Sequence, residues 1–520
     1  MSSREPRTIR LPLEAYPTMN PFALDLVKGR GSASKFCERR SFESMTPSGV
    51  VRDGDLVEAL VRSNAAWGND VAEDVRAWST GKTLTLIAGQ QVGLGGGPLY
   101  TLAKIASLIE LKRRFAAAGT PATALFWLAT EDHDFDEIAR IDLLSHGEVE
   151  TIRMSDPMSR RLVVGSREIP ENLRRDLCRI LEIDPSSDWL APSITFGDSF
   201  ARLIARVAPS ELVLVDSLLP ELRKAGVPLF AGLIESWSDL EGEISRRSEA
   251  IESAGYRRQV APVEDGRYRL LWLVGSRGER QPIVRDGNEW LAGSESVDLM
   301  QIARERPETI STGALTRPLL QDYVLAPDVF VGGPAEVAYY AQISGLHDRL
   351  GVRCPHVALR GHALVAPEKY LRALDRYRVD PVEAFDPVDE VILRHEADRL
   401  AELERIIEAM ARGLESGIAE VKDAVLDSDR SLEKSVARTA RRINHQVSKL
   451  SERGRRAIAR RDRERHKAIT RLCSMLNPGG VAQDRVIGWI SFWQTYGTWF
   501  VDRLVDGVRT DADTFSIVGL

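Results

Sequence analysis

The sequence has little cysteine, no long apolar run and little net charge. Its four cysteines are far apart and form no CxxC pair: Cys37, Cys178, Cys354 and Cys473. This spacing argues against a zinc ribbon and a disulfide framework, so we expect four reduced thiols. No stretch is apolar enough to span a membrane or to act as a signal peptide, so we expect a cytoplasmic protein. A formal charge of -6 over 520 residues favours neither a nucleic-acid-coating nor a membrane-surface protein.

The chain has ample material for a globular fold. Its apolar fraction of 43% and charged fraction of 28% are typical of folded soluble domains. Because 520 residues exceed the size at which one core stops growing, we expect two or three structural units.

Four short apolar runs are typical of buried strands: 83–88, 123–129, 211–216 and 328–331. A glycine-rich loop and a helical pattern separate the first two runs, as in a right-handed βαβ unit. We predict an α/β fold with a Rossmann-like doubly wound core over residues 1–380. In such folds, ligands bind outside the carboxyl ends of the strands. Residues 268–290 alternate like strands, with a turn at 286–288, and predict a β-rich insertion within about 220–310.

Residues 381–476 predict a coiled-coil hairpin. Apolar residues recur at three- and four-residue steps from Leu403 to Val425, and again from Val436 to Leu450 after a break at 427–429. Residues 383–429 carry 14 acidic and 5 basic residues, whereas residues 434–471 carry 14 basic and 3 acidic ones. The basic helix either lies against its acidic partner, which we favour, or binds the phosphates of a nucleic acid. Residues 477–520 predict a helical tail that packs on the core.

The loop Gly89–Pro98 lies between a strand and a helix, where backbone N–H groups can hold a phosphate or carboxylate. It matches neither the GxGxxG nor the GK[ST] pattern, and a tight crossover without a ligand is the alternative. Tyr100 and Lys104 lie on one face of the next helix, so Lys104 could reach a phosphate. The binding candidates are Gly89, Gln90, Gln91, Gly93, Pro98, Tyr100 and Lys104.

The strand at 123–129 runs into four ionisable residues that are candidates for catalysis: Glu131, Asp132, His133 and Asp134. Such a group is suited to acid–base work or a metal, although the carboxylates could also cap the following helix. We expect the carboxylates to raise the pKa of His133 and make it a candidate base.

The run at 328–331 leads into Gly332, Gly333 and Glu336, which again offer close backbone approach and a carboxylate in a first helical turn. Tyr340 follows at a spacing more typical of a core residue. Upstream, Arg317 could bind a carboxylate in bidentate fashion, or could be a surface residue.

Several segments occur in the order and approximate spacing of one known family: AGQQVGLGGGPLYTLAK, FWLATEDHDFDEI, STGALTRPLLQDYVL, FVGGPAEVAYYAQ, RRINHQVSKLSERGRRAIARRD and LNPGGVAQDRVIGWISFWQTYG. They resemble the cysteine ligases of bacillithiol biosynthesis over nearly the whole chain. The chain departs from the family in its three consecutive glycines at 95–97 and in Tyr340, where Trp is common. Neither change removes a polar group, and residues 1–77 match only loosely.

The resemblance implies a Rossmann-type core related to nucleotidyltransferases and a coiled coil associated with a homodimer. It also implies a reaction that joins the carboxyl group of cysteine to the amino group of glucosaminyl malate. Amide formation from a free carboxylate is uphill in water, so we expect coupling to ATP or another nucleoside triphosphate; a metal requirement stays open.

The mechanistic hypothesis gives each motif a role. The glycine loop and Lys104 hold an activating phosphate or acyl adenylate, and Arg317 binds a substrate carboxylate. His133, oriented by Asp132 or Asp134, takes a proton from the attacking amine. The alternatives are a nucleotidyltransferase acting on another small molecule, and a non-enzymatic coiled-coil or RNA-binding protein. We expect small-molecule partners, and neither a membrane nor a nucleic acid.

Overall fold

The computed structural model describes residues 6–138, 140–145, 148–154, 161–263 and 265–520. The chain forms two compact units. Unit 1 comprises Met1–Val365 and Val481–Leu520, and unit 2 comprises Ala366–Gly480. The coiled-coil hairpin was predicted to begin at residue 381, whereas unit 2 begins at Ala366.

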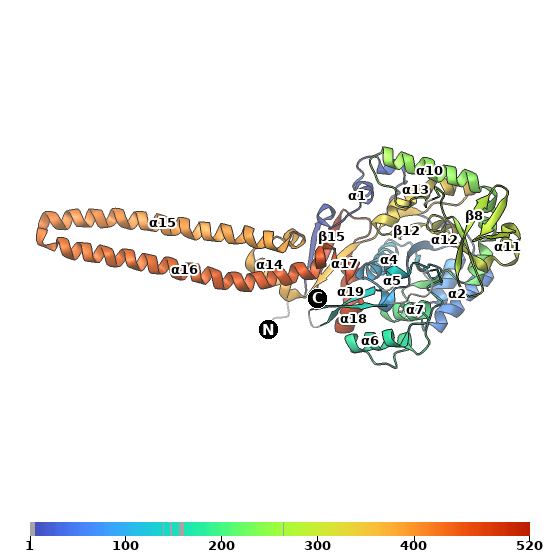
Figure 1. Cartoon of the computed structure of the whole chain (residues 1–520), viewed down its shortest axis with the longest axis horizontal. Helices are drawn as coiled ribbons and strands as arrows, with labels where there is room; N and C mark the ends of the chain where they lie inside the picture. The colour runs from blue at the N-terminus through green and yellow to red at the C-terminus, as the bar shows by residue number, and fades with distance from the viewer. Residues whose placement is uncertain (1–5, 139, 146–147, 155–160, 264) are drawn as a thin grey trace. The chain divides into compact units, whose positions relative to one another are not determined.

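A five-stranded parallel sheet forms the centre of unit 1 (Figure 1). Its order is β13-β12-β2-β3-β6, with β2 at Leu84–Gln90, β3 at Ala122–Leu128, β6 at Val213–Asp216, β12 at Val329–Gly332 and β13 at His356–Leu359. When these five strands are numbered 1 to 5 along the chain and the sheet is read from β6, the order is 3-2-1-4-5. This is a doubly wound arrangement, and the strand order reverses between β2 and β12. The predicted Rossmann-like fold is confirmed, and β13 is a fifth strand that the sequence did not predict.

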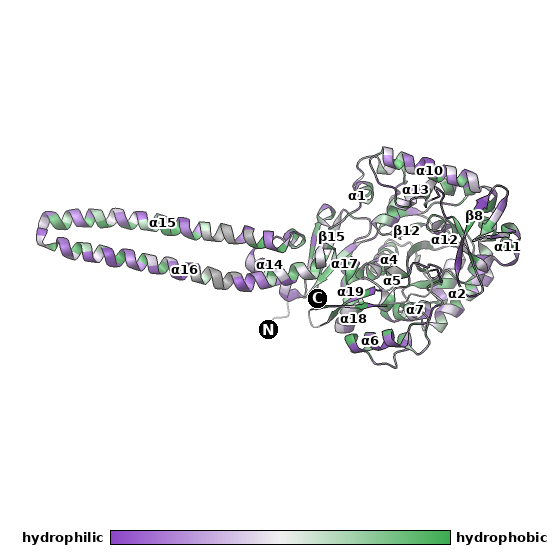
Figure 2. Ribbon diagram, viewed as in Figure 1, coloured by the Kyte–Doolittle hydropathy of each residue, from purple (hydrophilic) through white to green (hydrophobic). Residues whose placement is uncertain are grey.

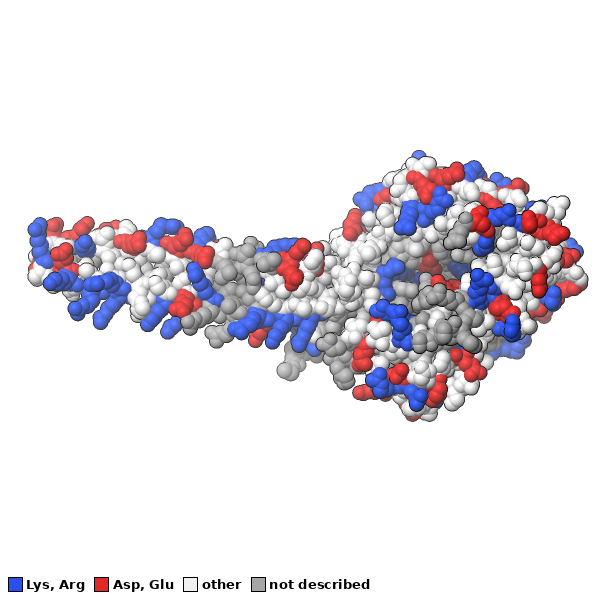
Figure 3. Space-filling view, viewed as in Figure 1, with Lys and Arg blue, Asp and Glu red and all other residues white. Residues whose placement is uncertain are grey.

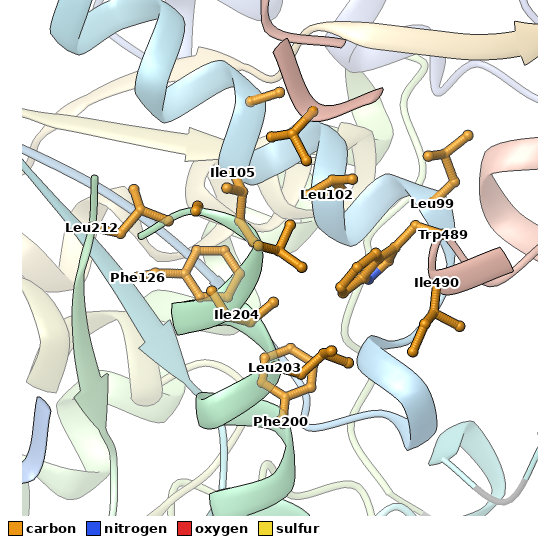
Figure 4. Close-up of a cluster of buried hydrophobic side chains, with 14 of the residues drawn as sticks. Leu99, Leu102, Ile105, Phe126, Phe200, Leu203, Ile204, Leu212, Trp489 and Ile490 are labelled. Carbon is orange, nitrogen blue, oxygen red and sulfur yellow. The ribbon is translucent and has the colours of Figure 1, made fainter. Parts of the chain in front are cut away.

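The core of unit 1 lies beside β3, between α4 (Leu99–Ala117) and α7 (Phe196–Val207). Figure 4 shows side chains from these elements directed toward one another and toward Trp489 of the C-terminal segment. All of the labelled side chains are buried: Leu99, Leu102, Ile105, Phe126, Phe200, Leu203, Ile204, Leu212, Trp489 and Ile490. Burial of each large apolar side chain contributes about 1.5–3 kcal/mol, so this cluster fixes α4 against the sheet.

The β-rich insertion is a five-stranded antiparallel sheet of order β10-β9-β8-β7-β11. Its strands are β7 (Leu271–Val274), β8 (Arg280–Asp286), β9 (Glu289–Ala292), β10 (Glu295–Val297) and β11 (Ile310–Thr312). The predicted turn joins β8 to β9, with Gly287 at a φ of 57°. The helices of the same region are α8 (Pro220–Ala225), α9 (Val227–Glu235), α10 (Trp237–Ser253) and α11 (Leu299–Glu305), and α12 (Arg317–Leu325) follows.

The C-terminal segment contains α17 (Gln483–Val486), α18 (Ile490–Tyr496), α19 (Thr498–Gly507) and a final strand, β15 (Thr514–Gly519). This strand pairs antiparallel with β1 (Thr8–Pro12), in a three-stranded sheet with β14 (His362–Ala366). The segment packs on α4, and it is not wholly helical because it ends in a strand.

The remaining elements of unit 1 surround these sheets. They are α1 (Pro21–Lys28), α2 (Gly54–Ala66), α3 (Ala72–Ser79), α5 (Phe135–Ile138), α6 (Glu171–Leu181), α13 (Pro334–Leu350) and the hairpin of β4 (Arg140–Ser145) and β5 (Glu148–Arg153). No helix in the described part of the chain combines the length and the apolar character that crossing a membrane requires.

Unit 2 is a helical hairpin. A short helix, α14 (Glu368–Tyr377), precedes α15 (Val388–Ser428) and α16 (Glu433–Leu476), which lie side by side and confirm the predicted coiled coil (Figure 1). Figure 2 shows polar and apolar residues alternating along both helices. Among described side chains Arg455 pairs with Glu404 at 3.1 Å. By contrast, nine described basic residues of α16 form no ion pair with a described residue: Lys434, Arg438, Arg441, Arg442, Lys449, Arg453, Arg463, Lys467 and Arg471.

Candidate active site

A cleft of about 1080 Å³ lies at the carboxyl edge of the parallel sheet, beside the insertion. Figure 3 shows a hollow on one face of unit 1, with basic side chains around it. Eleven of the predicted site residues line the cleft: Gly89, Gln90, Gln91, Tyr100, Lys104, Glu131, Asp132, His133, Arg317, Gly333 and Glu336. Four other predicted site residues do not line it: Gly93, Pro98, Gly332 and Asp134.

The glycine-rich loop packs against the protein itself. Gly96 has a φ of 85°, and a Cβ atom there would lie 2.2 Å from the ring of Trp489. The indole Nε1 of Trp489 donates a hydrogen bond of 2.8 Å to the carbonyl oxygen of Gly96. A glycine is therefore needed at position 96 for the close approach of the C-terminal segment. The second half of the loop corresponds to the alternative given above, a tight crossover without a ligand.

Lys104 of α4 links β2 to the start of α13, on the two sides of the point at which the sheet order reverses. Its Nζ donates to the carbonyl oxygen of Gly89 at 2.8 Å and to Oε1 of Gln90 at 2.9 Å, and it lies 2.5 Å from Oε2 of Glu336. Burial lowers the pKa of Lys104, although the Glu336 carboxylate opposes the shift. Glu336 also accepts from the backbone N–H of Gly333 and caps α13. The ammonium already has three oxygen partners, so Lys104 holds the site together and is not a free phosphate ligand.

Glu131 is buried beneath the cleft floor. Its carboxylate accepts from Arg223 at 2.7 Å and Ser311 at 2.6 Å, and from the backbone N–H and hydroxyl of Thr312 at 3.0 and 2.9 Å. Burial alone would raise the pKa of Glu131, but Arg223, Arg280 and the hydrogen bonds outweigh it, and the pKa is lowered. Glu131 therefore ties the end of β3 to β11 and α8.

His133 lies at the mouth of the same loop, and its ring packs against Trp272 with centroids 4.8 Å apart. Its Nδ1 lies 2.7 Å from a guanidinium nitrogen of Arg280, whereas Oδ1 of Asp132 is 3.7 Å away. The pKa of His133 is lowered, first by burial and then by Arg280, against the opposing effect of Asp132 and Asp134. The predicted rise in this pKa is therefore wrong, because the sequence did not place Arg280 beside the ring.

Asp132 is arranged by its own loop and by β2. Its Oδ1 accepts from the backbone N–H groups of His133 and Asp134 at 2.7 and 3.2 Å, and its Oδ2 accepts from Nε2 of Gln91 at 2.6 Å. Asp132 therefore orients the loop. The His133 ring was predicted to be oriented by Asp132, but its Nδ1 contacts Arg280 instead.

Several arginines that were not predicted as site residues line the cleft, among them Arg280 and Arg360, and Tyr339 lines it as well. Arg280 comes from β8, and Arg360 follows β13 and donates to Asp484 at 2.7 Å with both side chains buried. Arg317 donates to the hydroxyl of Tyr339 at 2.6 Å and is half-buried in the cleft wall, not on the outer surface. Tyr340 is fully buried beside Phe330, as its spacing predicted. The position of Arg360 directly after the apolar run of β13 is the sequence signal that could have identified it as a site residue.

Charge in the cleft is predominantly basic. Seven basic residues line it: Lys104, Arg161, Arg269, Arg280, Arg317, Arg360 and Arg485. Four acidic residues accompany them: Glu131, Asp132, Asp265 and Glu336. A cleft with this balance attracts carboxylates and phosphates. Across the described ranges, no group of three or more His, Cys, Asp or Glu side chains is placed to hold a metal ion.

A doubly wound sheet with a polar, basic cleft at its switch point defines a Rossmann-like α/β enzyme. Residues 31–361 match the family described as bacillithiol biosynthesis BshC, N-terminal Rossmann-like domain. Residues 363–520 match the family described as bacillithiol biosynthesis BshC, C-terminal coiled-coil domain. The chain belongs to the BshC family, which confirms the resemblance seen in the sequence, and it is an enzyme of the ligase class.

Three relatives show how far the similarity extends, and each carries the name "Putative cysteine ligase BshC". The protein from Solibacter usitatus is 29% identical over 82% of this chain and 83% of its own. That from Heliobacterium modesticaldum is 32% identical over 72% and 70%. That from Bacillus cereus is 26% identical over 87% and 88%.

Proposed function

We propose that the chain adds L-cysteine to glucosaminyl malate by forming an amide bond, in the last step of bacillithiol biosynthesis. The observation that carries the proposal is the basic cleft at the switch point of a chain that belongs to the BshC family. Glucosaminyl malate carries carboxylates, and a cleft with three more basic than acidic residues suits an anionic substrate.

The side chains of the cleft divide into two groups. Arg317 donates to Tyr339 and Gln321, and Arg360 donates to Asp484 and Gly361. A guanidinium has five N–H donors, so each arginine retains donors suited to substrate carboxylates. Asp132 has an unused lone pair on Oδ2 and faces the cleft. We therefore assign it the role of the base that accepts a proton from the attacking amine. His133 lies beside it and contacts the same reacting groups.

The energy for the bond requires a co-substrate, and we propose ATP or another nucleoside triphosphate. The chemistry of the lining fits such a molecule, because it combines basic side chains with apolar and aromatic ones that include Val260, Tyr268 and Trp272. When bound, the triphosphate would supply the leaving group that makes the cysteine carboxyl reactive.

We further propose that the enzyme works in the cytoplasm as a homodimer joined through unit 2. Two apolar side chains of the hairpin support the second part, because Val421 and Leu450 remain 59% and 54% exposed in the single chain. Long coiled coils commonly cover such residues by association with another helix.

Thiol profiling by mass spectrometry in a deletion strain of the source organism tests the proposal. We expect loss of bacillithiol and accumulation of glucosaminyl malate, restored by the wild-type gene but not by His133→Asn. Purified protein with cysteine, glucosaminyl malate and ATP should form the same product. If the thiol pool is unchanged and no second enzyme is present, the proposed reaction is wrong, and other amine acceptors should then be tried with the purified protein.

A further inference from the structure

Arg280 reaches from the insertion sheet to the imidazole of His133. One guanidinium nitrogen lies 2.7 Å from Nδ1 of His133, and the other donates to the carbonyl oxygen of Thr312 at 2.7 Å. The guanidinium carbon Cζ lies over the ring of Trp272, 5.0 Å from its centroid. The backbone N–H of Arg280 donates to the carbonyl oxygen of Arg161 at 2.8 Å. Contacts on several sides therefore fix the position of this buried side chain.

The direction of the hydrogen bond follows from the chemistry of the pair. A guanidinium has five N–H donors and no acceptor, and it stays charged in proteins. Nδ1 of His133 must therefore accept, which requires its lone pair to be free of a proton. A neutral imidazole with a bare Nδ1 carries its proton on Nε2. That Nε2 has no hydrogen-bond partner among the residues that the structure describes, and His133 lines the cleft.

We infer that Arg280 is a positioning residue that holds His133 as the neutral imidazole with its proton on Nε2, so that His133 presents an N–H donor to the cleft. In this form His133 donates to a negatively charged substrate oxygen, and it does not serve as the base in the resting enzyme. The use of this donor in turnover rests on the proposed function, whereas the tautomer does not.

The charged groups around the ring act in opposite directions. Arg280 from β8 and Arg161 from the segment before α6 disfavour the imidazolium, and Asp132 and Asp134 from the same loop as His133 favour it. Burial adds to the effect of the arginines, and together they keep the pKa of His133 below its ordinary value. The neutral form therefore persists to lower pH than in a free histidine, and loss of Arg280 removes one of the two largest effects that disfavour the imidazolium.

Nitrogen NMR of the full-length protein with [15N]histidine reads the tautomer directly. The His133 signals are assigned by their absence in His133→Asn. We expect a protonated Nε2 and an unprotonated Nδ1 in the wild-type protein at neutral pH, and a titration midpoint below that of a free histidine. This measurement needs no folded Arg280 variant. A protonated Nδ1 in the wild-type protein would overturn the inference.

Substitution of Arg280 supplies the second test. In Arg280→Gln, we expect the pKa of His133 to rise and the Nδ1-protonated or doubly protonated form to appear. We also expect kcat/KM to fall roughly 10- to 100-fold and the acidic limb of the pH–rate profile to move to higher pH. Arg277→Gln is the matched control because it removes an 88% exposed arginine from the same hairpin. It should change neither the spectrum nor the rate.

The two proposals fail in different ways. An unchanged His133 spectrum in folded Arg280→Gln contradicts the positioning role, whatever reaction the enzyme performs. The expected spectra together with an unchanged cellular thiol pool contradict the proposed reaction and leave the tautomer assignment intact.

Discussion

Glu131 joins three segments of unit 1 through one buried carboxylate. Its ionic partner, Arg223, is fully buried in α8. Replacement of Glu131 by Gln therefore leaves a buried guanidinium without its counter-charge. Breaking a buried pair in this way costs about 3–5 kcal/mol, and we expect Glu131→Gln to lower the free energy of unfolding by about 3 kcal/mol because the amide keeps some hydrogen bonds. Urea denaturation measures this, with the exposed Asp134→Asn as the control that stays within about 0.5 kcal/mol.

The same residue predicts a dependence of stability on pH. The pKa of Glu131 is lowered in the folded protein from its ordinary value of 4.5, so its contribution is complete above about pH 4.5 and is lost as pH falls through the folded pKa. We expect the stability difference between wild type and Glu131→Gln to be constant near neutral pH and to shrink below pH 4.5. A difference that grows as the solution becomes more acidic would contradict the charged state assigned to Glu131.

Residue patterns alone located the part of the cleft formed at the ends of β2, β3 and β12, but not the arginines that other segments supply. His133 and Lys104 could be predicted because each follows directly from a strand or a glycine loop at the carboxyl edge. Arg280 lies 147 residues from His133, on a strand whose alternation does not reveal which side chain it will meet. The direction of the His133 pKa depends on that contact, so the sequence could not supply it.

The loop between β2 and α4 and the C-terminal segment constrain each other through Gly96. We expect Gly96→Ala to lower the free energy of unfolding by at least 2 kcal/mol, because the new methyl group adds a clash with Trp489 to the strain of a positive φ. Gly119→Ala is the matched control, since Gly119 has a φ of 80° but no atom within 4 Å of the added Cβ. It should lose only about 1 kcal/mol in the same thermal or urea experiment. Equal losses in the two variants would show that the packing against Trp489 is not tight.

The pair of Lys104 and Glu336 connects α4 to α13 across the switch point. Removing either partner leaves the other charge without its nearest neighbour, so Lys104→Met and Glu336→Gln should each destabilise the protein. In the double variant both charges are absent, and we expect a coupling free energy of about 1–3 kcal/mol. The coupling free energy should lie near the lower end of this range because Glu336 is partly exposed. Additive losses would mean that the two side chains do not interact in solution.

Elements with a strong local pattern were predictable, and elements that lack such a pattern were not. The runs that became β2, β3, β6 and β12 are apolar and end in glycine or polar residues, so their place in a parallel sheet followed from the spacing. β13 spans His356–Leu359 and begins with a polar residue, which hides it in the sequence. β15 is stabilised by pairing with β1, more than 500 residues away, and no local pattern reports such a partner.

At the scale of the whole molecule, the two units bury their apolar residues differently. Unit 1 has a closed core with side chains such as Trp489 and Phe126 fully buried. In unit 2, the described apolar residues of the hairpin seam are half-buried or exposed, because two helices alone enclose little volume. Stability of unit 2 should therefore depend on association more than that of unit 1.

Exposed apolar residues on the hairpin predict the oligomeric state. We expect the wild-type chain to have about twice the monomer mass of 57.8 kDa in light scattering at micromolar concentration. Val421→Glu combined with Leu450→Glu should shift it to the monomer, because burying each of the native side chains contributes about 1.5–3 kcal/mol and burying a carboxylate is strongly unfavourable.

The control for this pair is Ser416→Glu combined with Ser448→Glu, which adds the same charge at exposed positions of the same two helices. It should remain dimeric, and circular dichroism should show that both variants keep their helix content. A monomeric wild-type chain contradicts the proposed assembly outright. A dimer that survives Val421→Glu with Leu450→Glu means that other residues form the contact, since a coiled-coil interface cannot accept two buried carboxylates per chain without a large loss of affinity.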